Sequence, residues 1–336
     1  MHPLTPQEVV STVREIGALP QTMATVLKVL DNPDSSADEI ANVINRDVAL
    51  TSRVLKMVNS VRYGRSRKVA HVTEAVRVMG LNSIKVLTLS SSVFGIKPED
   101  DLFEQLNIKR IWRHFIETAI VARNIAEEAG YHDPEEAFIA GLLHDIGIVI
   151  MMLHFKDDFL TVIKNLEKSK AGIIAAETGQ WSFSHCDVGA AMAETWKLPP
   201  RVIHVIKHHH DITSPAIIPE DDLLNAIVAA ADRIAFGPFD HYTTGVEDDI
   251  RFVQTARDKI QLDHETLKNI RKRSLIQSIE LANYLELDAG DIIEVLTDAN
   301  DCLADLYFSL EQVLIEKNQL ENRLNLQNPK LETQPA

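Results

Sequence analysis

The chain has 336 residues, of which 45% are hydrophobic, and a formal net charge of −15 at pH 7. This length suits about two domains with a sizeable core, and the excess of acid works against binding to nucleic acid or to anionic membranes. Two cysteines, Cys186 and Cys302, are too few for a disulfide-rich scaffold. Cys186 is expected to be buried and inert, with a redox-sensitive thiol as the alternative. No export signal or uncharged membrane-spanning stretch is evident, so we expect a cytoplasmic protein.

Apolar residues recur at intervals of three to four along almost the whole chain, and the alternation typical of strands is not sustained. This spacing predicts an all-α protein. Ser36-Ala-Asp-Glu39 has the form of a capping box, and Asp47 can cap the helix that follows. Gly64 and Gly80 are expected to end helices. These short helices form the first predicted domain, residues 1–100.

The second predicted domain, residues 101–240, has longer and more apolar helices. They are expected at 108–129, 134–153, 156–169, 184–195, 199–210 and 221–236. Gly, Pro, Thr and acidic residues then predict an exposed loop at 237–249. The third region, residues 241–327, is expected to hold helices at about 262–285 and 288–326, and residues 328–336 to be a disordered tail.

Part of the last helix also has the spacing of a coiled coil. Leucines and other apolar residues follow the three-and-four repeat over residues 296–324. One interpretation is an amphipathic helix that folds back on its own domain. The other is self-association or docking to a partner helix. Because the segment beyond Glu311 is mostly polar outside this stripe, we favour a homo-oligomer formed through the C-terminal helix.

His144 and Asp145 stand side by side in the apolar segment Gly141-Leu-Leu-His-Asp-Ile-Gly147. A single His-Asp pair in a helix is usually structural, with the imidazole donating to a backbone carbonyl. An unpaired carboxylate in such a segment would be costly to bury, however, which favours a cation beside it. Such donors suit a hard or borderline divalent cation. Further candidate ligands in neighbouring apolar segments are His114, His185, His208, His209 and Asp232.

Several of these segments resemble the HDOD family, a signalling-associated branch of the HD superfamily of metal-dependent phosphohydrolases. The resemblance runs from about Ile16 to Phe236. Its N-terminal markers are Leu19-Pro20, Asp47–Leu50, Val58–Gly64 and Ala75–Gly80, and its HD-like markers are Trp112–His114, Ala137–Gly147, Ser184–Gly189, Trp196–Pro199 and His208-His209. The resemblance implies an N-terminal helical subdomain packed on an HD-like helical bundle, and the long C-terminal helix predicted from the apolar spacing follows them.

The resemblance also implies two metal positions. The first would be held by His114, His144, Asp145 and Asp232. The second, as in the related HD-GYP proteins that hydrolyse cyclic di-GMP, would be held by His185, His208 and His209. The implied cofactor is a divalent metal in a mononuclear or binuclear site, and Fe, Mn, Ni, Zn and Co all suit these donors.

Three departures from the HD-GYP pattern argue against catalysis. Ile148 stands where those phosphodiesterases have a lysine that steadies a substrate phosphate, Arg110 replaces their glutamate, and Gly-Tyr-Pro after the paired histidines is missing. The cation that offsets phosphate charge is therefore lost, unless Arg110, Arg113 or Lys207 replaces it. We expect a bacterial signalling protein that acts through contacts with partner proteins. A metal-dependent phosphohydrolase acting on a nucleotide or cyclic dinucleotide is the alternative.

A concentrated basic run, Arg62-Tyr-Gly-Arg-Ser-Arg-Lys68, joins two of the short predicted helices. Basic residues between paired helices occur in some DNA-binding motifs, but a solvated loop is the more common outcome. Nucleic acid is therefore not expected as a partner. Asn59 and Tyr63 are expected either to fix this loop by hydrogen bonds or, with Arg62, Arg65 and Arg67, to form a surface for a protein partner.

Overall fold

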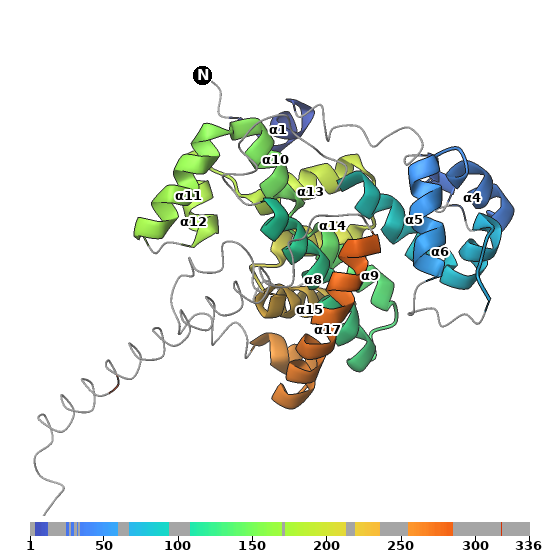
Figure 1. The fold of residues 1–336 in the computed structure, drawn as a ribbon. Helices are drawn as coiled ribbons and strands as arrows, with labels where there is room; N and C mark the ends of the chain where they lie inside the picture. The colour runs from blue at the N-terminus through green and yellow to red at the C-terminus, as the bar shows by residue number, and fades with distance from the viewer. Residues whose placement is uncertain are drawn as a thin grey trace, which may run out of the picture. The chain divides into compact units, whose positions relative to one another are not determined.

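A computed structural model gives the fold (Figure 1). It describes residues 4–12, 25–26, 28–29, 32, 34–59, 67–93, 108–169, 172–212, 219–235, 255–284 and 317. All the regular structure in these residues is helical, which confirms the predicted all-α class. The chain divides into two compact units, Met1–Ala289 and Gly290–Ala336. Apart from Lys317, the predicted coiled-coil segment and the tail lie outside the described residues.

Local sequence signals set the ends of the N-terminal helices. The predicted capping box opens α4, because Ser36 Oγ accepts from the Glu39 N–H at 3.2 Å and the Glu39 carboxylate accepts from the Ser36 N–H at 2.8 Å. Asp47 caps α5 as predicted. Gly80 interrupts α6 with a φ of 78°, which confirms the predicted break. These elements are α1 (Pro6–Thr12), α4 (Ala37–Ile44), α5 (Val48–Val58) and α6 (Val72–Val93).

Asn59 joins the two ends of the loop between α5 and α6. Its Nδ2 donates to the carbonyls of Leu55, at 2.7 Å, and Val69, at 2.8 Å. Its Oδ1 accepts from the Val69 N–H at 2.7 Å. These three bonds fix the loop ends in the way that one of the sequence interpretations expected. Arg67 is exposed, whereas Arg62, Tyr63 and Arg65 lie outside the described residues.

We expect Asn59→Ala to lower the free energy of unfolding by about 2 kcal/mol, because it removes these bonds and leaves the Val69 backbone groups without their partner. Urea unfolding measures the change. Asn165→Ala is the matched control, since Asn165 is exposed on a helix and its replacement should change stability by less than about 0.5 kcal/mol. Equal effects of the two substitutions would contradict a fixing role for Asn59.

Longer helices form the HD-like part. Most lie where they were predicted, but α12 was not predicted, and the helix predicted at 134–153 is in fact two helices that separate at His144-Asp145. Asp145 has non-helical backbone angles there, φ −103° and ψ 15°. The elements are α8 (Ile108–Glu128), α9 (Pro134–Leu143), α10 (Ile146–Phe155), α11 (Asp157–Ser169), α12 (Ile173–Trp181), α13 (His185–Thr195), α14 (Pro200–His208), α15 (Pro219–Ala235) and α17 (His264–Tyr284).

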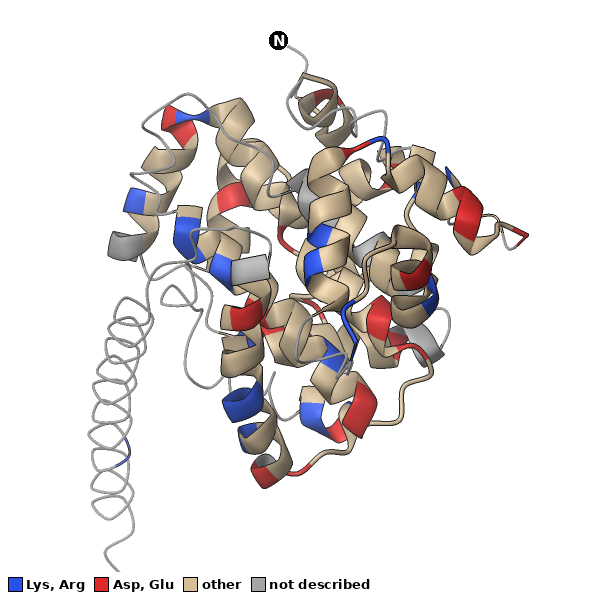
Figure 2. Ribbon diagram, turned by 45° about the vertical axis from the view of Figure 1, so that its right-hand side comes forward, with Lys and Arg blue, Asp and Glu red and all other residues tan. Residues whose placement is uncertain are grey.

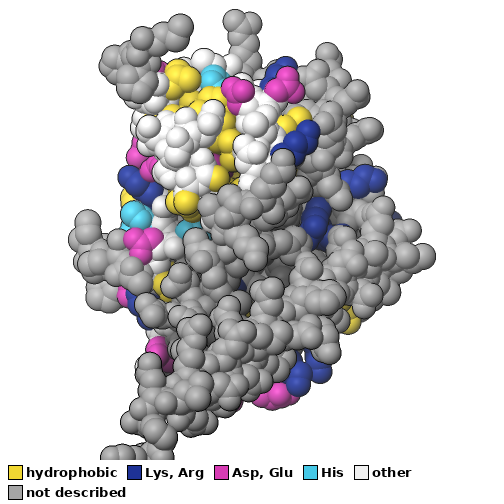
Figure 3. Space-filling model, turned by 90° about the vertical axis from the view of Figure 1, so that its left-hand side faces the viewer, with side chains coloured by type: hydrophobic (Ala, Val, Ile, Leu, Met, Phe, Trp, Pro, Cys, Tyr) yellow, Lys and Arg dark blue, Asp and Glu magenta, His cyan; other side chains and the backbone are white. Residues whose placement is uncertain are grey.

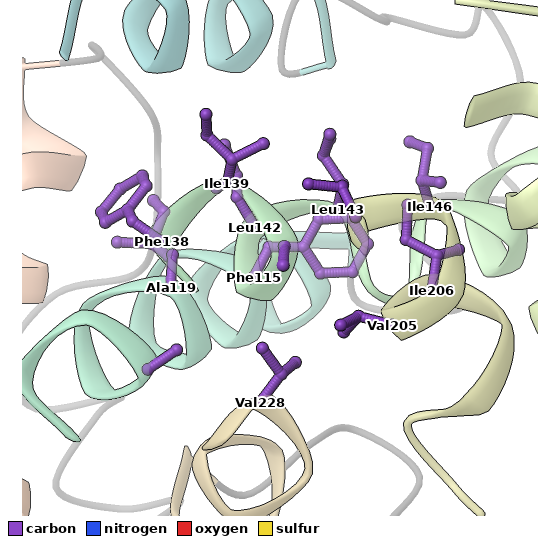
Figure 4. Packing of buried hydrophobic residues seen from close by; sticks show 14 of the residues in the cluster. Phe115, Ala119, Phe138, Ile139, Leu142, Leu143, Ile146, Val205, Ile206 and Val228 are labelled. Atoms are coloured by element: carbon purple, nitrogen blue, oxygen red, sulfur yellow. The ribbon is translucent and has the colours of Figure 1, made fainter. Parts of the chain in front are cut away.

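The hydrophobic core of this part lies where α8, α9, α14 and α15 meet (Figure 4). Phe115, Leu142, Val205 and Val228 are fully buried there, one from each of these helices. The segment Pro134–Phe155 is long and apolar enough to cross a membrane, but 83% of its most apolar stretch is buried inside the protein. Burial in the core of the bundle therefore explains why this segment is so apolar.

The N-terminal helices pack on the HD-like bundle, as the resemblance implied. Helix α6 contacts α9, α5 contacts α17, and α1 contacts both α10 and α13. Thr12 Oγ1, at the end of α1, lies 2.6 Å from His154 Nδ1 on α10. The predicted boundary near residue 100 therefore lies inside the first compact unit, Met1–Ala289.

Candidate metal centre

Six of the seven predicted ligands meet in one cluster, and none of the six is more than 6% exposed. Separate helices bring them together, since apolar neighbours bury the adjoining face of each helix. They are His114 on α8, His144 and Asp145 between α9 and α10, His185 at the start of α13, His209 directly after α14, and Asp232 on α15.

Asp145 lies at the centre of the cluster, with one carboxylate oxygen facing each of two groups. Its Oδ2 is 3.3 Å from Nε2 of His144 and 3.7 Å from Nε2 of His114. Its Oδ1 is 3.3 Å from Nε2 of His185 and 3.2 Å from Nε2 of His209. Asp145 can therefore serve either group or bridge cations held by both.

The first group consists of His114, His144 and Asp232. Nε2 of His114 lies 3.0 Å from Asp232 Oδ1 and 3.2 Å from Nε2 of His144. Nε2 of His144 lies 3.4 Å from the same carboxylate oxygen. Two lone pairs at this distance would repel each other, so at least one of the two nitrogens must be protonated or both must face a cation. The three ligand atoms are close enough to hold one ion.

The second group contains buried polar atoms that lack partners. Nε2 of His185, Nε2 of His209 and Asp145 Oδ1 have no hydrogen-bond partner in the part of the chain that the structure describes. Each buried polar atom without a partner costs about 1–3 kcal/mol. A cation between the two imidazoles and the carboxylate would satisfy all three atoms. The residues of this group therefore fit a divalent metal.

His208 lies outside the cluster, and His210 lies beside it instead. The His208 ring pairs with that of His204, at 4.7 Å between centroids, and both residues are only half-buried. The His210 ring lies 5.2 Å from that of His185 and 4.2 Å from that of His209. This corrects the predicted pair by one residue. Three consecutive histidines allow two registers, and the end of α14 at His208 selects between them.

Backbone carbonyls orient two of the rings toward the cluster. Nδ1 of His144 donates to the carbonyl of Gly141 at 2.7 Å, and Nδ1 of His209 donates to that of Ile206 at 3.0 Å. With Nδ1 engaged as a donor, the neutral form of each ring carries its lone pair on Nε2, which faces Asp145. The tautomer that ligation requires is thus already fixed by the fold.

Glu177 on α12 orients the His185 ring in the same way. Its Oε2 accepts from His185 Nδ1 at 2.8 Å and from the His185 N–H at 2.9 Å, and its side chain is fully buried. Glu177 was not among the residues predicted from the sequence. A single glutamate in an unpredicted helix gives no local signal, because its partner is contributed by another helix.

We expect Glu177→Gln to weaken metal binding by the second group roughly 10–100-fold, since the amide loses the charge that holds His185 in its ligand tautomer. Metal titration of purified protein measures the change. Glu194→Gln is the control, because Glu194 lies exposed on the same helix as His185. A folded Glu177→Gln protein with unchanged affinity would exclude this orienting role.

A family model for the HDOD domain matches residues 16–212. The chain belongs to the HDOD family. It is similar in structure to an HDOD domain protein from Geobacter sulfurreducens, with 25% identity, a TM-score of 0.63, and coverage of 83% of this chain and 96% of that one. It is 27% identical to an uncharacterized protein of Treponema pallidum over 60% of this chain, and 26% identical to ribonuclease Y of Geotalea uraniireducens over 66%. The chain spans 38% of the length of these two curated relatives.

Buried carboxylates make the centre of this HDOD protein attractive to cations. Burial acts to lower the pKa of His144, but Asp145 and Asp232 outweigh it and raise that pKa to about 10. Burial acts to raise the pKa of Asp145, but the charge of the neighbouring His144 outweighs it and holds that pKa well below its usual value. The pocket therefore holds protons when it holds no metal.

We expect metal binding at pH 8 to release at least one proton. His144 is protonated there, because its pKa is about 10, and a ligating imidazole must be neutral. The apparent affinity should rise with pH, about tenfold per unit for each proton released, and this rise should end near the pKa of His144. Calorimetry in buffers of different ionisation enthalpy counts the protons. Binding without proton release at pH 8 would contradict the shift.

The residues considered for phosphate contact differ in position. Arg110 is half-buried and lies one turn before His114, on the same face of α8. Burial raises the pKa of Glu117 to about 7, while His114, Arg113 and Arg271 act to lower it, so the Arg113 charge lies near that carboxylate. Lys207 is exposed. Ile148 is 2% exposed, three residues beyond Asp145.

Proposed function

We propose that this HDOD protein is a regulatory protein that acts through contacts with other proteins, and that its HD site holds metal with little or no catalytic activity. The burial of the centre carries this proposal: none of the six clustered donors is more than 6% exposed. Ile148, 2% exposed, adds an aliphatic side chain where HD-GYP phosphodiesterases have a lysine. A phosphodiester needs both access and an offsetting cation.

On this proposal the site binds two cations. His114, His144 and Asp232 would hold the first, His185, His209 and His210 the second, and Asp145 lies between them. A bound divalent cation supplies Lewis acidity and fixes the geometry of its ligands. Because these ligands come from α8, α13 and α15, from the junction of α9 and α10 and from the residues directly after α14, metal loading would set the packing of the bundle on which α1, α5 and α6 lie. A protein partner could then distinguish the metal-loaded bundle from the metal-free bundle by this packing.

A metal-dependent phosphohydrolase is the second candidate. The set of six clustered donors favours it, as does the similarity to ribonuclease Y. In this case a nucleotide or cyclic dinucleotide would have to reach donors that are now buried. Arg110, on the face of α8 that carries His114, would then offset the phosphate charge.

Turnover assays separate the two candidates. Protein loaded with Mn²⁺ or Fe²⁺ is incubated with cyclic di-GMP, with bis(p-nitrophenyl) phosphate and with a short RNA, and its Tm is measured with and without metal. We expect no turnover but a rise in Tm, because metal at a thousandfold excess over Kd stabilises the fold by about 4 kcal/mol. Metal-dependent turnover that Asp145→Asn abolishes would overturn the regulatory proposal and establish the second candidate.

Self-association through residues 296–324 and a cytoplasmic, bacterial setting belong to the same proposal. Leu306→Lys with Leu310→Lys should convert an oligomer to monomer in sedimentation equilibrium; an unchanged mass would exclude this interface.

The surface charge bears on nucleic acid as a partner. Charged residues of both signs are spread over the described helices (Figure 2), and basic and acidic side chains are interspersed on the face that Figure 3 shows. With the net charge of −15, this distribution does not favour nucleic acid as a partner.

A further inference from the structure

Cys186 lies beside the second group, and from the sequence it was expected to be buried and inert, with a redox-sensitive thiol as the alternative. The ligand atoms of His185, Cys186, His209 and His210 all lie within 4.8 Å of one another. Cys186 follows His185 directly in the first turn of α13, is 5% exposed and forms no disulfide. Three imidazoles and one thiol therefore share a small buried volume.

We propose that the Cys186 thiolate is a ligand of the second cation, together with His185, His209 and His210. Around a tetrahedral zinc ion, nitrogen ligands at about 2.0–2.1 Å and sulfur at about 2.3 Å are separated from one another by about 3.3–3.6 Å. Side-chain shifts on the order of 1 Å would bring these four donors to that spacing. On binding, the thiol proton passes to solvent.

The partnerless imidazole nitrogens are an independent indication of a ligand here. His185 and His209 are both fully buried, and Nε2 of each has no hydrogen-bond partner among the described residues. Their Nδ1 atoms donate to Glu177 and to the Ile206 carbonyl, so in the neutral rings each Nε2 carries the lone pair, at 3.3 Å (His185) and 3.2 Å (His209) from Asp145 Oδ1. A cation, and not a further hydrogen-bond acceptor, satisfies two such lone pairs.

A sulfur donor makes the second position chemically different from the first. The first group offers only nitrogen and oxygen, which suits Mn²⁺ or Fe²⁺, whereas a thiolate shifts preference toward Zn²⁺. Four protein donors also fill a tetrahedral shell, and closed four-ligand sites are structural because they leave no position for a substrate. This inference rests on the proposed function and gives it a reason: the second ion ties α13 to the end of α14 without opening a catalytic position.

Cobalt substitution tests the thiolate directly. Co²⁺ bound by a thiolate gives an intense near-ultraviolet charge-transfer band, which nitrogen and oxygen ligands alone do not give. Metal-free full-length protein titrated with Co²⁺ should develop this band, Cys186→Ser should lose it, and Cys302→Ser, which removes the other cysteine, should keep it. Failure to bind Co²⁺, binding without the band, or a band that survives Cys186→Ser would each overturn the inference.

His210 provides a second test with a matched control. His210→Ala should weaken the second equivalent of Zn²⁺ roughly 100-fold and leave the first group intact. His208 lies two residues before His210 in the same run but outside the cluster, so His208→Ala should leave the affinity for both equivalents of Zn²⁺ unchanged. Equal losses in the two variants would contradict the assignment. Phosphodiester turnover would overturn the proposed function without affecting the cobalt band, so the two failures are distinguishable.

Discussion

Gly147→Ala is expected to lower the free energy of unfolding by about 3 kcal/mol or more, at or beyond the usual upper limit for overpacking. Gly147 lies in the first turn of α10, directly against α13. A Cβ atom at this position would lie 1.9 Å from the His185 carbonyl oxygen and 2.8 Å from the Gly189 backbone nitrogen. Both neighbours are backbone atoms, so no side-chain rotation can relieve the overlap and the helices must separate.

The same separation should also damage the metal centre. Asp145 lies two residues before Gly147, and its Oδ1 approaches His185 Nε2 to 3.3 Å. Moving α13 away would therefore weaken the second group more than the first, whose histidines lie on α8 and at the end of α9. Metal titration beside urea unfolding measures both effects.

Gly179→Ala is the matched control. A Cβ at Gly179 would meet no atom within 4 Å, and the residue is exposed in α12. The substitution should stabilise the protein by about 0.5–1 kcal/mol, because alanine loses less backbone entropy in a helix. If Gly147→Ala were as well tolerated as this control, close contact of α10 with α13 would not be needed for the fold.

The sequence predicted those features of the fold that depend on neighbouring residues. The capping box at Ser36 and the break at Gly80 depend on neighbours in the sequence, and both were predicted. The break at His144-Asp145 was not predicted. Almost all residues of α9 and α10 are buried, so the apolar pattern continues across the junction without a change that would mark it. Apolar periodicity indicates which residues are buried, and it does not mark where a wholly buried segment changes direction.

The candidate site divides in the same way. His and Asp in apolar segments were informative because burying them costs free energy unless they are paired, and six of the seven predicted ligands do cluster. His208 was misplaced because a run of three histidines leaves the register to the end of α14. Glu177 was missed because the helix that carries it, α12, was not predicted, and Cys186 was not considered as a ligand because a buried cysteine is usually inert. The coiled-coil segment 296–324 stays a prediction.

Asp145→Asn is expected to weaken metal binding by the first group about 100-fold or more. The amide keeps the shape of the carboxylate, but it carries no charge and places a donor where both oxygens now face imidazole nitrogens. The second group should lose only about tenfold, because it retains three histidines and, on our inference, a thiolate. Elemental analysis after Mn²⁺ and Zn²⁺ loading should therefore show one equivalent of Zn²⁺ and no Mn²⁺.

The metal-free variant should also be less stable, by about 3–5 kcal/mol near pH 6, because it leaves a buried imidazolium without one of its carboxylates. The folded pKa of His144, about 10, lies above the unfolded value of 6.5, so the stabilisation by Asp145 is complete below pH 6.5 and is lost as pH rises toward 10. The destabilisation should shrink over this range. Asp158→Asn, at an exposed site on α11, should show neither effect.

These two readouts separate the roles of Asp145. A variant that is destabilised near pH 6 yet still binds Mn²⁺ would show that the carboxylate only balances protonated histidines. A variant that loses Mn²⁺ without the pH-dependent destabilisation would show that Asp145 is a metal ligand, and that solvent replaces its interaction with the histidines in the metal-free protein. We expect both changes together, because Oδ2 faces the His114 and His144 nitrogens that hold either a proton or a metal ion. The same charge that raises the pKa of His144 would favour a bound cation in its place.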